Sequence, residues 1–305
     1  MAALYAAVLA QMGQETTVIA TSPVRAQPLA SSHDMRFYDK GLEAALVELP
    51  LPDAAIVALP VDKLAAAAER LATAGVRRVL VEKPGCLTGS ELGPVVDAAD
   101  RSGSFVAIAY NRRFFASVIE ARRRIETAGG ALSCVFEFCE DVQRIGALPT
   151  PEAIKQNWVL ANSSHVIDLA FHLCGMPSHW TTQTTGQLSW HDRGADFRGM
   201  GETVRGTRFS YYADWRGPGR WGLEIVLPDE RLILRPMEKL AVMPRGRFEA
   251  EAVEIDDTLD GRFKPGLYAQ IRAILQEVPD ANLVTARQQL EAVTSIYDRI
   301  AGYQG

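Results

Sequence analysis

Short apolar segments alternate with helical segments over the first third of the sequence, and this rhythm constrains the fold more than any other feature. Four segments are predicted to be buried strands: Thr16–Ala20, Ala54–Leu59, Val76–Val81 and Phe105–Ala109. The stretches between them include a long alanine-rich helix that begins near Asp62. Strands that are connected through helices form right-handed units of a parallel sheet. The sequence therefore predicts an α/β domain at the N-terminal end.

One of these strands ends in the tripeptide Glu82-Lys83-Pro84. Pro84 has no backbone N–H to donate to a neighbouring strand, so strand pairing is expected to stop there. Glu82 and Lys83 then stand at the carboxyl end of a parallel strand, where open α/β sheets bind their ligands. Taken alone, an exposed Glu-Lys pair is the alternative interpretation, because most charged side chains are simply solvated.

Beyond Gly129-Gly130 the pattern changes, because strands follow one another without intervening helices. The predicted strands span 131–140, 180–190, 203–215, 220–227, 231–235 and 252–255. Such runs predict an α+β domain with a mainly antiparallel sheet. One face of this sheet is expected to be covered by helices, while the other faces solvent or a partner. Two helices, Pro265–Glu277 and Thr285–Ala301, follow the strands.

The segment Ser164–Leu173 is predicted to be a helix with three titratable side chains on one side. At about 100° per residue, His165, Asp168 and His172 share a narrow stripe, and apolar residues cover the remaining circumference. Buried titratable groups need partners, so three in one stripe favour a site facing a cleft over a single core histidine. A metal ion is an alternative because histidine and carboxylate are common ligands. No second ligand cluster supports it, and we predict no metal.

Composition excludes several classes of protein. A chain of 305 residues is long enough for two domains, and its net charge of −5 argues against general nucleic-acid binding. No apolar run approaches the ~20 residues of a membrane span. The cysteines lack the spacing of a metal or CxxC site and are predicted to be reduced thiols of a cytoplasmic protein. They are Cys86, Cys134, Cys139 and Cys174.

Three segments together resemble the glucose-fructose oxidoreductase/inositol dehydrogenase/rhizopine catabolism (Gfo/Idh/MocA) family. They are Glu82-Lys83-Pro84 after a strand, the AYNRRF segment at 109–114 and the HVIDLAFHLCG segment at 165–175. The resemblance implies a Rossmann-like dinucleotide-binding domain at 1–114 and a substrate and oligomerisation domain at 115–284. It also implies that the helix within 285–305 packs back on the first domain. Homodimers or homotetramers through the sheet of the second domain are implied as well.

The resemblance places Lys83, Asp168 and His172 in the catalytic positions, with His165 in a supporting role. Histidine suits the base that removes a hydroxyl proton, because its unperturbed pKa of ~6.5 lies near working pH. Lys83 is expected to polarise the reacting oxygen, and Asp168 to orient His172 or bind a neighbouring hydroxyl. Arg113 is interpreted instead as the start of the polar face of the helix at 115–128. The residues expected to contact the substrate are Lys83, Arg112, His165, Asp168 and His172.

The cofactor expected from the resemblance is NADP or NAD. The segment after the first predicted strand, Thr21–Arg25, contains no carboxylate to bind the ribose of NAD, whereas hydroxyls and an arginine suit a 2′-phosphate. A surface turn with an incidental arginine is the alternative interpretation. The loop after the second strand keeps only the proline of the family's cofactor loop. The expected cofactor contacts are Thr21, Ser22, Arg25, Leu59, Pro60, Glu82, Lys83 and Asn111.

The first strand of a dinucleotide-binding domain and its GxGxxG turn do not precede the helix at Ala2–Gln11. We therefore expect an N-terminally shortened chain, with a gap or an exposed edge in the middle of the parallel sheet.

The predicted function is an NAD(P)-dependent oxidoreductase that acts on a sugar, a cyclitol or a sugar derivative. One alternative is a relative that uses the nicotinamide transiently, for glycoside cleavage or aldose–aldose chemistry. The other is a regulatory or binding protein that has lost dinucleotide binding, which the missing glycine turn favours.

Overall fold

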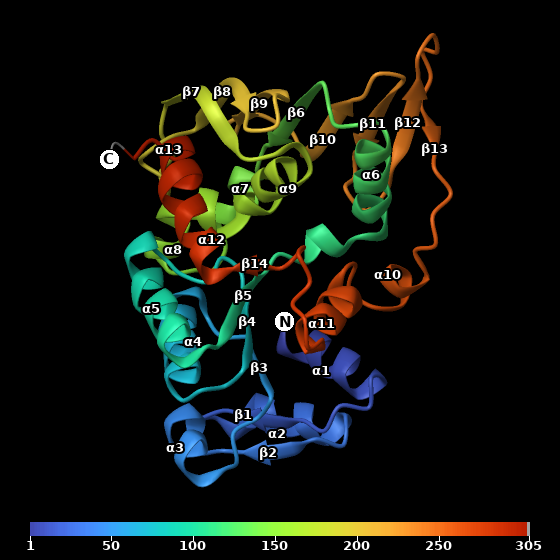
Figure 1. The fold of residues 1–305 in the computed structure, drawn as a ribbon. Coiled ribbons are helices and arrows are strands. Elements are labelled where there is room, and N and C mark those ends of the chain that lie inside the picture. Colours follow the sequence, from blue (N-terminus) through green and yellow to red (C-terminus); the bar gives the residue numbers. More distant parts are fainter. Residues whose placement is uncertain (304–305) are drawn as a thin grey trace. The chain divides into compact units, whose positions relative to one another are not determined.

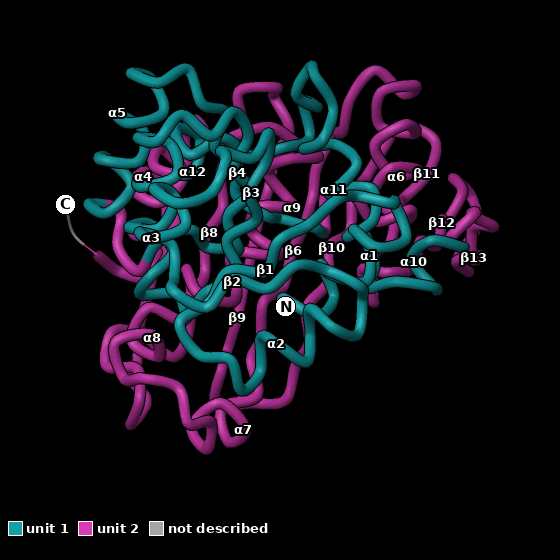
Figure 2. Tube along the Cα trace, turned by 90° about the horizontal axis from the view of Figure 1, so that it is seen from below, with its two compact units in different colours: residues 1–86, 90–111, 258–289 teal, residues 87–89, 112–257, 290–305 magenta. Residues whose placement is uncertain are grey.

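A computed structural model describes residues 1–303 of the chain, which form two compact units (Figures 1 and 2). Unit 1 contains residues 1–86, 90–111 and 258–289, drawn in teal in Figure 2. Unit 2 contains residues 87–89, 112–257 and the chain from Leu290 onward. Each unit has its own sheet system and is described by itself.

The strands of unit 1 form a parallel sheet system, as predicted. β1 (Thr17–Ile19) pairs parallel with β2 (Arg36–Tyr38) in a separate two-stranded sheet. A four-stranded sheet has the order β14-β5-β4-β3, in which all neighbours are parallel except β14 and β5. Its strands are β3 (Ala54–Val57), β4 (Arg78–Glu82), β5 (Phe105–Ala109) and β14 (Val284–Thr285). No strand pairing joins the two sheets within the described residues, so the expected interruption of the parallel sheet is present.

The helices of unit 1 bury small apolar faces against these strands. α4 (Leu64–Thr73) is the clearest case, because both its leucines and all its alanines except Ala66 are buried while its polar residues face outward. The other helices are α1 (Ala2–Gln11), α2 (Pro23–Ser32), α3 (Gly41–Glu48), α5 (Leu92–Ser102), α10 (Thr258–Arg262), α11 (Leu267–Leu275) and the first part of α12 (Ala286–Ala292). Short 3₁₀ turns η1 (Val61–Lys63), η2 (Gly89–Glu91) and η3 (Asn111–Phe114) complete the connections.

Sequence patterns did not predict α2 or β2. α2 carries Pro28 in its interior and buries only Ala30, so its sequence lacks the apolar periodicity of a helix. β2 has only three residues, and none of them is fully buried.

The C-terminal segments divide between the units differently from the predicted domain boundaries. Residues 258–284 were assigned to the second domain, but they belong to unit 1. They do so because β14 pairs with β5, and because α11 lies against α1 and β4.

The C-terminal helix, expected at 285–305 to pack on the first domain, divides between the units: residues 285–289 belong to unit 1, and the described residues from Leu290 onward belong to unit 2. Thr184 in β7 donates a hydrogen bond to the carbonyl of Ile300 at 2.7 Å. The guanidinium of Arg299 lies 4.1 Å from the ring centroid of Trp180. These contacts hold the last turns on the edge of the large sheet. They involve the π-helical turn η5 (Val293–Tyr297) and α13 (Asp298–Ile300).

Unit 2 is built on an eight-stranded sheet with the order β13-β12-β11-β10-β6-β9-β8-β7. All neighbouring pairs are antiparallel except β6 and β9, so the predicted mainly antiparallel sheet is confirmed. Its strands are β6 (Ser133–Phe138), β7 (Pro177–Thr185), β8 (Asp196–Thr203), β9 (Arg208–Asp214), β10 (Trp221–Val226), β11 (Glu230–Leu234), β12 (Ala241–Pro244) and β13 (Glu251–Ala252).

β8 was not predicted, because Gly199 and Gly201 interrupt its apolar pattern. The structure explains both glycines through packing. A Cβ at Gly199 would lie 2.4 Å from the ring of Tyr211, and one at Gly201 would lie 2.3 Å from Cβ of Trp180. These glycines therefore make room for aromatic side chains of the neighbouring strands.

One face of this sheet is covered by the buried helix α9 (Ser164–Cys174) and by an aromatic core. The ring of Phe136 packs edge-on against Phe171 at 5.6 Å and stacks with Tyr211 at 5.2 Å between centroids. The other helical elements of unit 2 are α6 (Ala116–Thr127), α7 (Val142–Gly146), α8 (Glu152–Gln156) and the π-helical turn η4 (Val159–Ser163).

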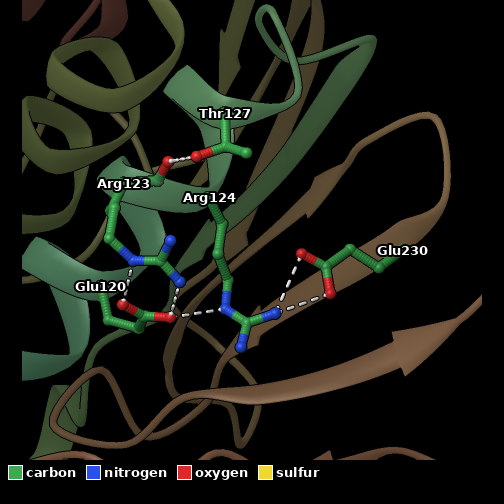
Figure 3. Close-up of polar contacts among 5 residues, drawn as sticks. All are labelled: Glu120, Arg123, Arg124, Thr127 and Glu230. Carbon is green, nitrogen blue, oxygen red and sulfur yellow. Dashed lines mark hydrogen bonds and ion pairs between the residues drawn. The ribbon is translucent and has the colours of Figure 1, made fainter.

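The arginine-rich helix α6 is tied to the sheet by charge. Arg124 donates to Glu120 on its own helix at 2.8 Å and to Glu230 at the start of β11 at 2.8 Å (Figure 3). Arg123 pairs with the same Glu120. The predicted polar face of this helix is thus an ion-pair network that fastens α6 to β11.

Among the described residues, no helix has both the length and the apolar character needed to cross a bilayer. The four cysteines are buried reduced thiols.

Candidate functional site

Lys83 follows the carboxyl end of β4, and the residue before it is held by a long-range hydrogen bond. The hydroxyl of Tyr5 in α1 donates to Oε1 of Glu82 at 2.6 Å. Tyr5 is only 3% exposed, and burial together with the neighbouring carboxylate raises its pKa well above the usual value. Tyr5 therefore remains a hydrogen-bond donor to Glu82 at any physiological pH.

The residue after Lys83 is held from a different part of the chain. Gln289 in α12 is fully buried, and its Nε2 donates to the carbonyl of Pro84 at 2.8 Å and to Tyr110 Oη at 3.0 Å. The backbone then turns, because Gly85 N donates to the carbonyl of Glu82 at 3.0 Å. Gly85 has φ +85°, and a Cβ there would lie 2.6 Å from Ile108, so only glycine fits this turn. Lys83 thus stands between two immobilised neighbours, which is the support that a reactive side chain requires.

Asn111 stands at the end of the adjacent strand β5 and is 4% exposed. Its Nδ2 donates to the carbonyl of Pro265 at 2.9 Å. Within unit 1 this amide is therefore already engaged with the backbone, and it fixes the strand end next to that of β4.

The remaining residues expected to bind a dinucleotide lie at the carboxyl ends of β1 and β3 and are exposed. Ser22 is the N-cap residue of α2, yet its side chain makes no capping hydrogen bond. Arg25 has no hydrogen-bond or ion-pair partner among the described residues, and Thr21 and Pro60 are exposed beside them. Leu59 is 46% exposed, which is unusual for a leucine at a strand end. Uncommitted hydroxyls, a cation and open apolar surface fit the ribose, phosphate and ring faces of a dinucleotide.

In unit 2, a buried carboxylate fixes the start of α9. Glu140 accepts from Ser163 Oγ at 2.7 Å and from Asn162 Nδ2 at 3.1 Å. Both donors belong to the π-helical turn η4 that leads into α9. The segment Asn162-Ser163-Ser164 therefore has a structural role at this helix start.

Asp168 forms a two-point ion pair with Arg113. Arg113 Nε donates to one carboxylate oxygen at 2.8 Å and Nη2 to the other at 2.6 Å. The side chains are 14% and 7% exposed. Arg113 was interpreted as part of the polar face of α6, but it lies in η3 and is half-buried against α9. No hydrogen bond joins Asp168 to His172 within the described chain, so Asp168 orients Arg113 here.

His172 lies in a strongly positive environment. Burial, together with the positive charges of Arg113, Arg122 and Arg205, lowers its pKa from 6.5 to about 2. Its Nε2 is buried and has no hydrogen-bond partner among residues 1–303. Burial and these positive charges therefore disfavour the protonated form of His172.

His165 has a different environment although it shares the same helix face. It is 6% exposed, and its ring centroid lies 6.1 Å from that of Trp221 in β10. The same indole ring carries the guanidinium of Arg112 at 4.9 Å. The predicted stripe on α9 thus divides into three environments: His165 near Trp221, Asp168 on Arg113, and His172 among arginines.

The structure brings Glu82, Lys83 and Asn111 together at neighbouring strand ends of unit 1. It brings Arg112, His165 and Trp221 together in unit 2. Sequence reasoning missed the residues that support them, namely Tyr5, Gln289, Glu140 and Trp221. Each is far from its partner in sequence, and no local pattern marks it.

The second face of the unit 2 sheet, opposite α9, is open. A depression of about 670 Å³ lies there and is lined by side chains of β6, β8, β9, β10 and β11, among them Val135, Met200, Ser210, Glu224 and Arg231. Met200 is 65% exposed. Across residues 1–303, no group of three or more His, Cys, Asp or Glu side chains is arranged to hold a metal ion.

Comparison with known proteins gives one match at the family level. Residues 2–110 match the Gfo/Idh/MocA profile, described as an oxidoreductase family with an NAD-binding Rossmann fold. This is the family that the three motifs resemble. No curated protein sequence matches the chain.

Solved structures match over nearly the whole chain. UDP-N-acetylglucosamine 3-dehydrogenase from Acidithiobacillus ferrooxidans is 18% identical with a TM-score of 0.75, covering 99% of this chain and 94% of that one. A putative NADPH-dependent oxidoreductase from Desulfitobacterium hafniense is 13% identical with a TM-score of 0.81, covering 98% and 92%. Levoglucosan dehydrogenase in complex with NADH and levoglucosan is 19% identical with a TM-score of 0.68, covering 98% and 86%. At these identities the likeness shows a shared fold.

The environment of His172 predicts a specific loss of stability in acid. Because its pKa is lower in the folded state than the ~6.5 of an unfolded chain, the unfolded state binds the extra proton as pH falls. The free energy of unfolding should therefore decrease below pH 6.5, and it should be about 2 kcal/mol lower at pH 5. Asparagine does not titrate. We therefore expect the free energy of unfolding of His172→Asn to fall by about 2 kcal/mol less than that of the parent protein between pH 7.5 and pH 5. Urea unfolding at both pH values measures this, and equal losses in the two proteins would contradict it.

Proposed function

We propose that the chain is an NAD(P)-dependent sugar oxidoreductase, and the proposal starts from the match of residues 2–110 to the model of the NAD-binding Rossmann oxidoreductase family. It transfers hydride between nicotinamide and a hydroxyl or keto group of a sugar, a cyclitol or a sugar derivative. The observation that carries the proposal is the immobilised turn around Lys83, with Glu82 held by Tyr5 and Pro84 held by Gln289. A lysine fixed in this way at the carboxyl end of a parallel strand suits catalysis better than it suits solvation.

In the proposed reaction the protein supplies position and charge. A bound nicotinamide would accept the hydride that leaves the carbon of the alcohol. Lys83 holds the reacting oxygen and stabilises the negative charge that develops on it. Arg113 and Asp168 neutralise each other and keep the middle of α9 in place.

We assign the role of base to His165 in preference to His172. A base works best when its pKa lies near the working pH, and a histidine with a pKa of about 2 takes up a proton poorly. His165 is the other histidine of the stripe, and its ring lies beside Trp221, the indole that also carries Arg112. His165 therefore receives the hydroxyl proton when the alcohol is oxidised.

Three variants test these roles. Lys83→Met and His165→Asn should each lower kcat by at least about 100-fold, the range that a lost acid–base or charge-stabilising group typically covers. His172→Asn should stay within about tenfold of the parent. Reduction of NAD⁺ and NADP⁺ is followed by absorbance against a panel of sugars and cyclitols, with NADH affinity measured on the same preparations.

Other outcomes would identify another function. If no substrate reduces either nucleotide while sugars are still cleaved or isomerised, the nicotinamide is used transiently. If neither nucleotide binds, the chain is a binding protein on this fold. A His172→Asn loss that exceeds the His165→Asn loss would return the role of base to His172.

We also propose that NADP(H) binds more tightly than NAD(H). The exposed hydroxyl of Ser22 and the unpartnered guanidinium of Arg25 provide donors for a 2′-phosphate, and no carboxylate in 21–25 favours a free ribose hydroxyl. We expect Arg25→Ala to weaken NADPH binding about tenfold and to leave NADH binding within twofold. Calorimetric titration of both nucleotides decides this, and equal affinities in the parent protein would refute the preference.

Finally, we propose that the chain forms a homodimer, or a tetramer built from such dimers, through the open face of the unit 2 sheet. An open sheet face with an exposed methionine and a broad depression is typical of a surface that is buried on association. We expect Met200→Glu to shift the protein towards monomer in sedimentation velocity. Val204→Glu, in the β8–β9 turn and 69% exposed, is the matched control that should not. A monomeric parent protein would rule the interface out.

A further inference from the structure

Arg112 occupies an unusual position for an arginine in this chain. It is half-buried at the start of unit 2, and its guanidinium carbon lies 4.9 Å from the ring centroid of Trp221 and 5.9 Å from that of Phe115. Two aromatic rings therefore hold the guanidinium by cation–π contacts, which fix its plane without using its N–H groups.

No acceptor in the described chain satisfies those N–H groups. The side chain of Arg112 takes part in no hydrogen bond and no ion pair among residues 1–303, and its Nε is fully buried without a partner. Every other half-buried arginine in the described chain has an oxygen acceptor. These are Arg78, Arg113, Arg122, Arg124 and Arg235.

The protein also leaves the charge of Arg112 largely uncompensated. Burial lowers its pKa to about 10, so the guanidinium is still charged at neutral pH. The carboxylates that attract it are those of Glu238 and Glu140. Glu238 is exposed to water, and Glu140 is bonded to Asn162 and Ser163. A partly buried cation without an acceptor is costly unless a ligand provides one.

We propose that Arg112, on its Trp221 platform, is a recognition site for an anionic group of the substrate, either a carboxylate or a phosphate. This rests on the proposed function and names its substrate class: an acidic sugar, in the form of a sugar acid or a sugar phosphate. The guanidinium offers a planar fork of donors that matches two oxygens of either anion. Because His165 lies against the same Trp221 ring, the anion would be held beside the group assigned as base.

The test measures binding apart from turnover. The full chain in saturating NADH is titrated calorimetrically with D-glucuronate, D-glucose 6-phosphate and D-glucose at constant ionic strength. NADH cannot oxidise the hydroxyl groups of these compounds, and a constant NADH absorbance during the titration verifies that their open-chain aldehydes are not reduced. We expect at least one of the two acidic sugars to bind tenfold or more tightly than glucose. The difference should shrink as NaCl is raised, because part of it is electrostatic.

The variants locate the effect at one side chain. Arg112→Gln should abolish the preference for the acidic sugar, and Arg112→Lys should retain only part of it, because ammonium keeps the charge without the planar fork. Arg144→Gln is the matched control, since Arg144 is exposed in the same unit and its side chain has no partner. It should behave as the parent does. Whether glucuronate or glucose 6-phosphate binds more tightly identifies the anion as carboxylate or phosphate.

Several results would overturn the proposal. Equal binding of acidic and neutral sugars by the parent protein would do so, and this readout does not depend on any variant folding. An unchanged preference for acidic sugars in Arg112→Gln would also overturn it. So would an Arg112→Gln variant that loses only affinity for NADPH and keeps its sugar binding. Oxidation of neutral sugars without any anion preference would leave the oxidoreductase assignment intact while removing this inference. Anion binding without hydride transfer from any sugar would support this inference and contradict the oxidoreductase assignment.

Discussion

Two hydrogen bonds that converge on one turn organise the nucleotide-binding unit. Tyr5 from the first helix holds Glu82, and Gln289 from the last fifth of the chain holds Pro84, so Lys83 is fixed from both sides. The donors are buried, which makes each bond strong and its loss expensive. The strand end, the first helix and the C-terminal segment of the unit are therefore coupled through a single tripeptide.

The second unit shows how one helix face produces three chemical environments. His165, Asp168 and His172 are neighbours on α9, yet an indole, a guanidinium and a group of positive charges surround them in turn. The environment of each group comes from elements remote in sequence: β10, η3, α6 and the β8–β9 turn. Position on a helix thus selects which side chains line the face, while the opposing elements determine their protonation and orientation.

This division explains how far the sequence could predict the structure. Apolar periodicity was enough for the parallel strands β1, β3, β4 and β5, and the proline after Lys83 was enough to place Lys83 at a strand end. Periodicity failed for α2, which contains Pro28 and buries only Ala30, and for β8, whose glycines are explained only by the side chains of Tyr211 and Trp180. The low pKa of His172 and the burial of Arg112 depend on long-range packing. No local pattern encodes such packing, so the role assigned to His172 could not be judged from sequence.

The order of synthesis gives the interleaved chain a further consequence. Unit 1 contains residues 1–111 almost entirely, but also 258–289, so its β5 lacks an antiparallel neighbour until residues 284 and 285 have left the ribosome. Until then, the buried amide of Asn111 lacks its hydrogen-bond acceptor, the Pro265 carbonyl, and the Lys83 turn lacks the donor Gln289. The nascent nucleotide-binding unit must therefore wait, incompletely packed, while all strands of the other unit are made. Folding from the N-terminal end onward, the usual course for successive domains, is closed to this topology.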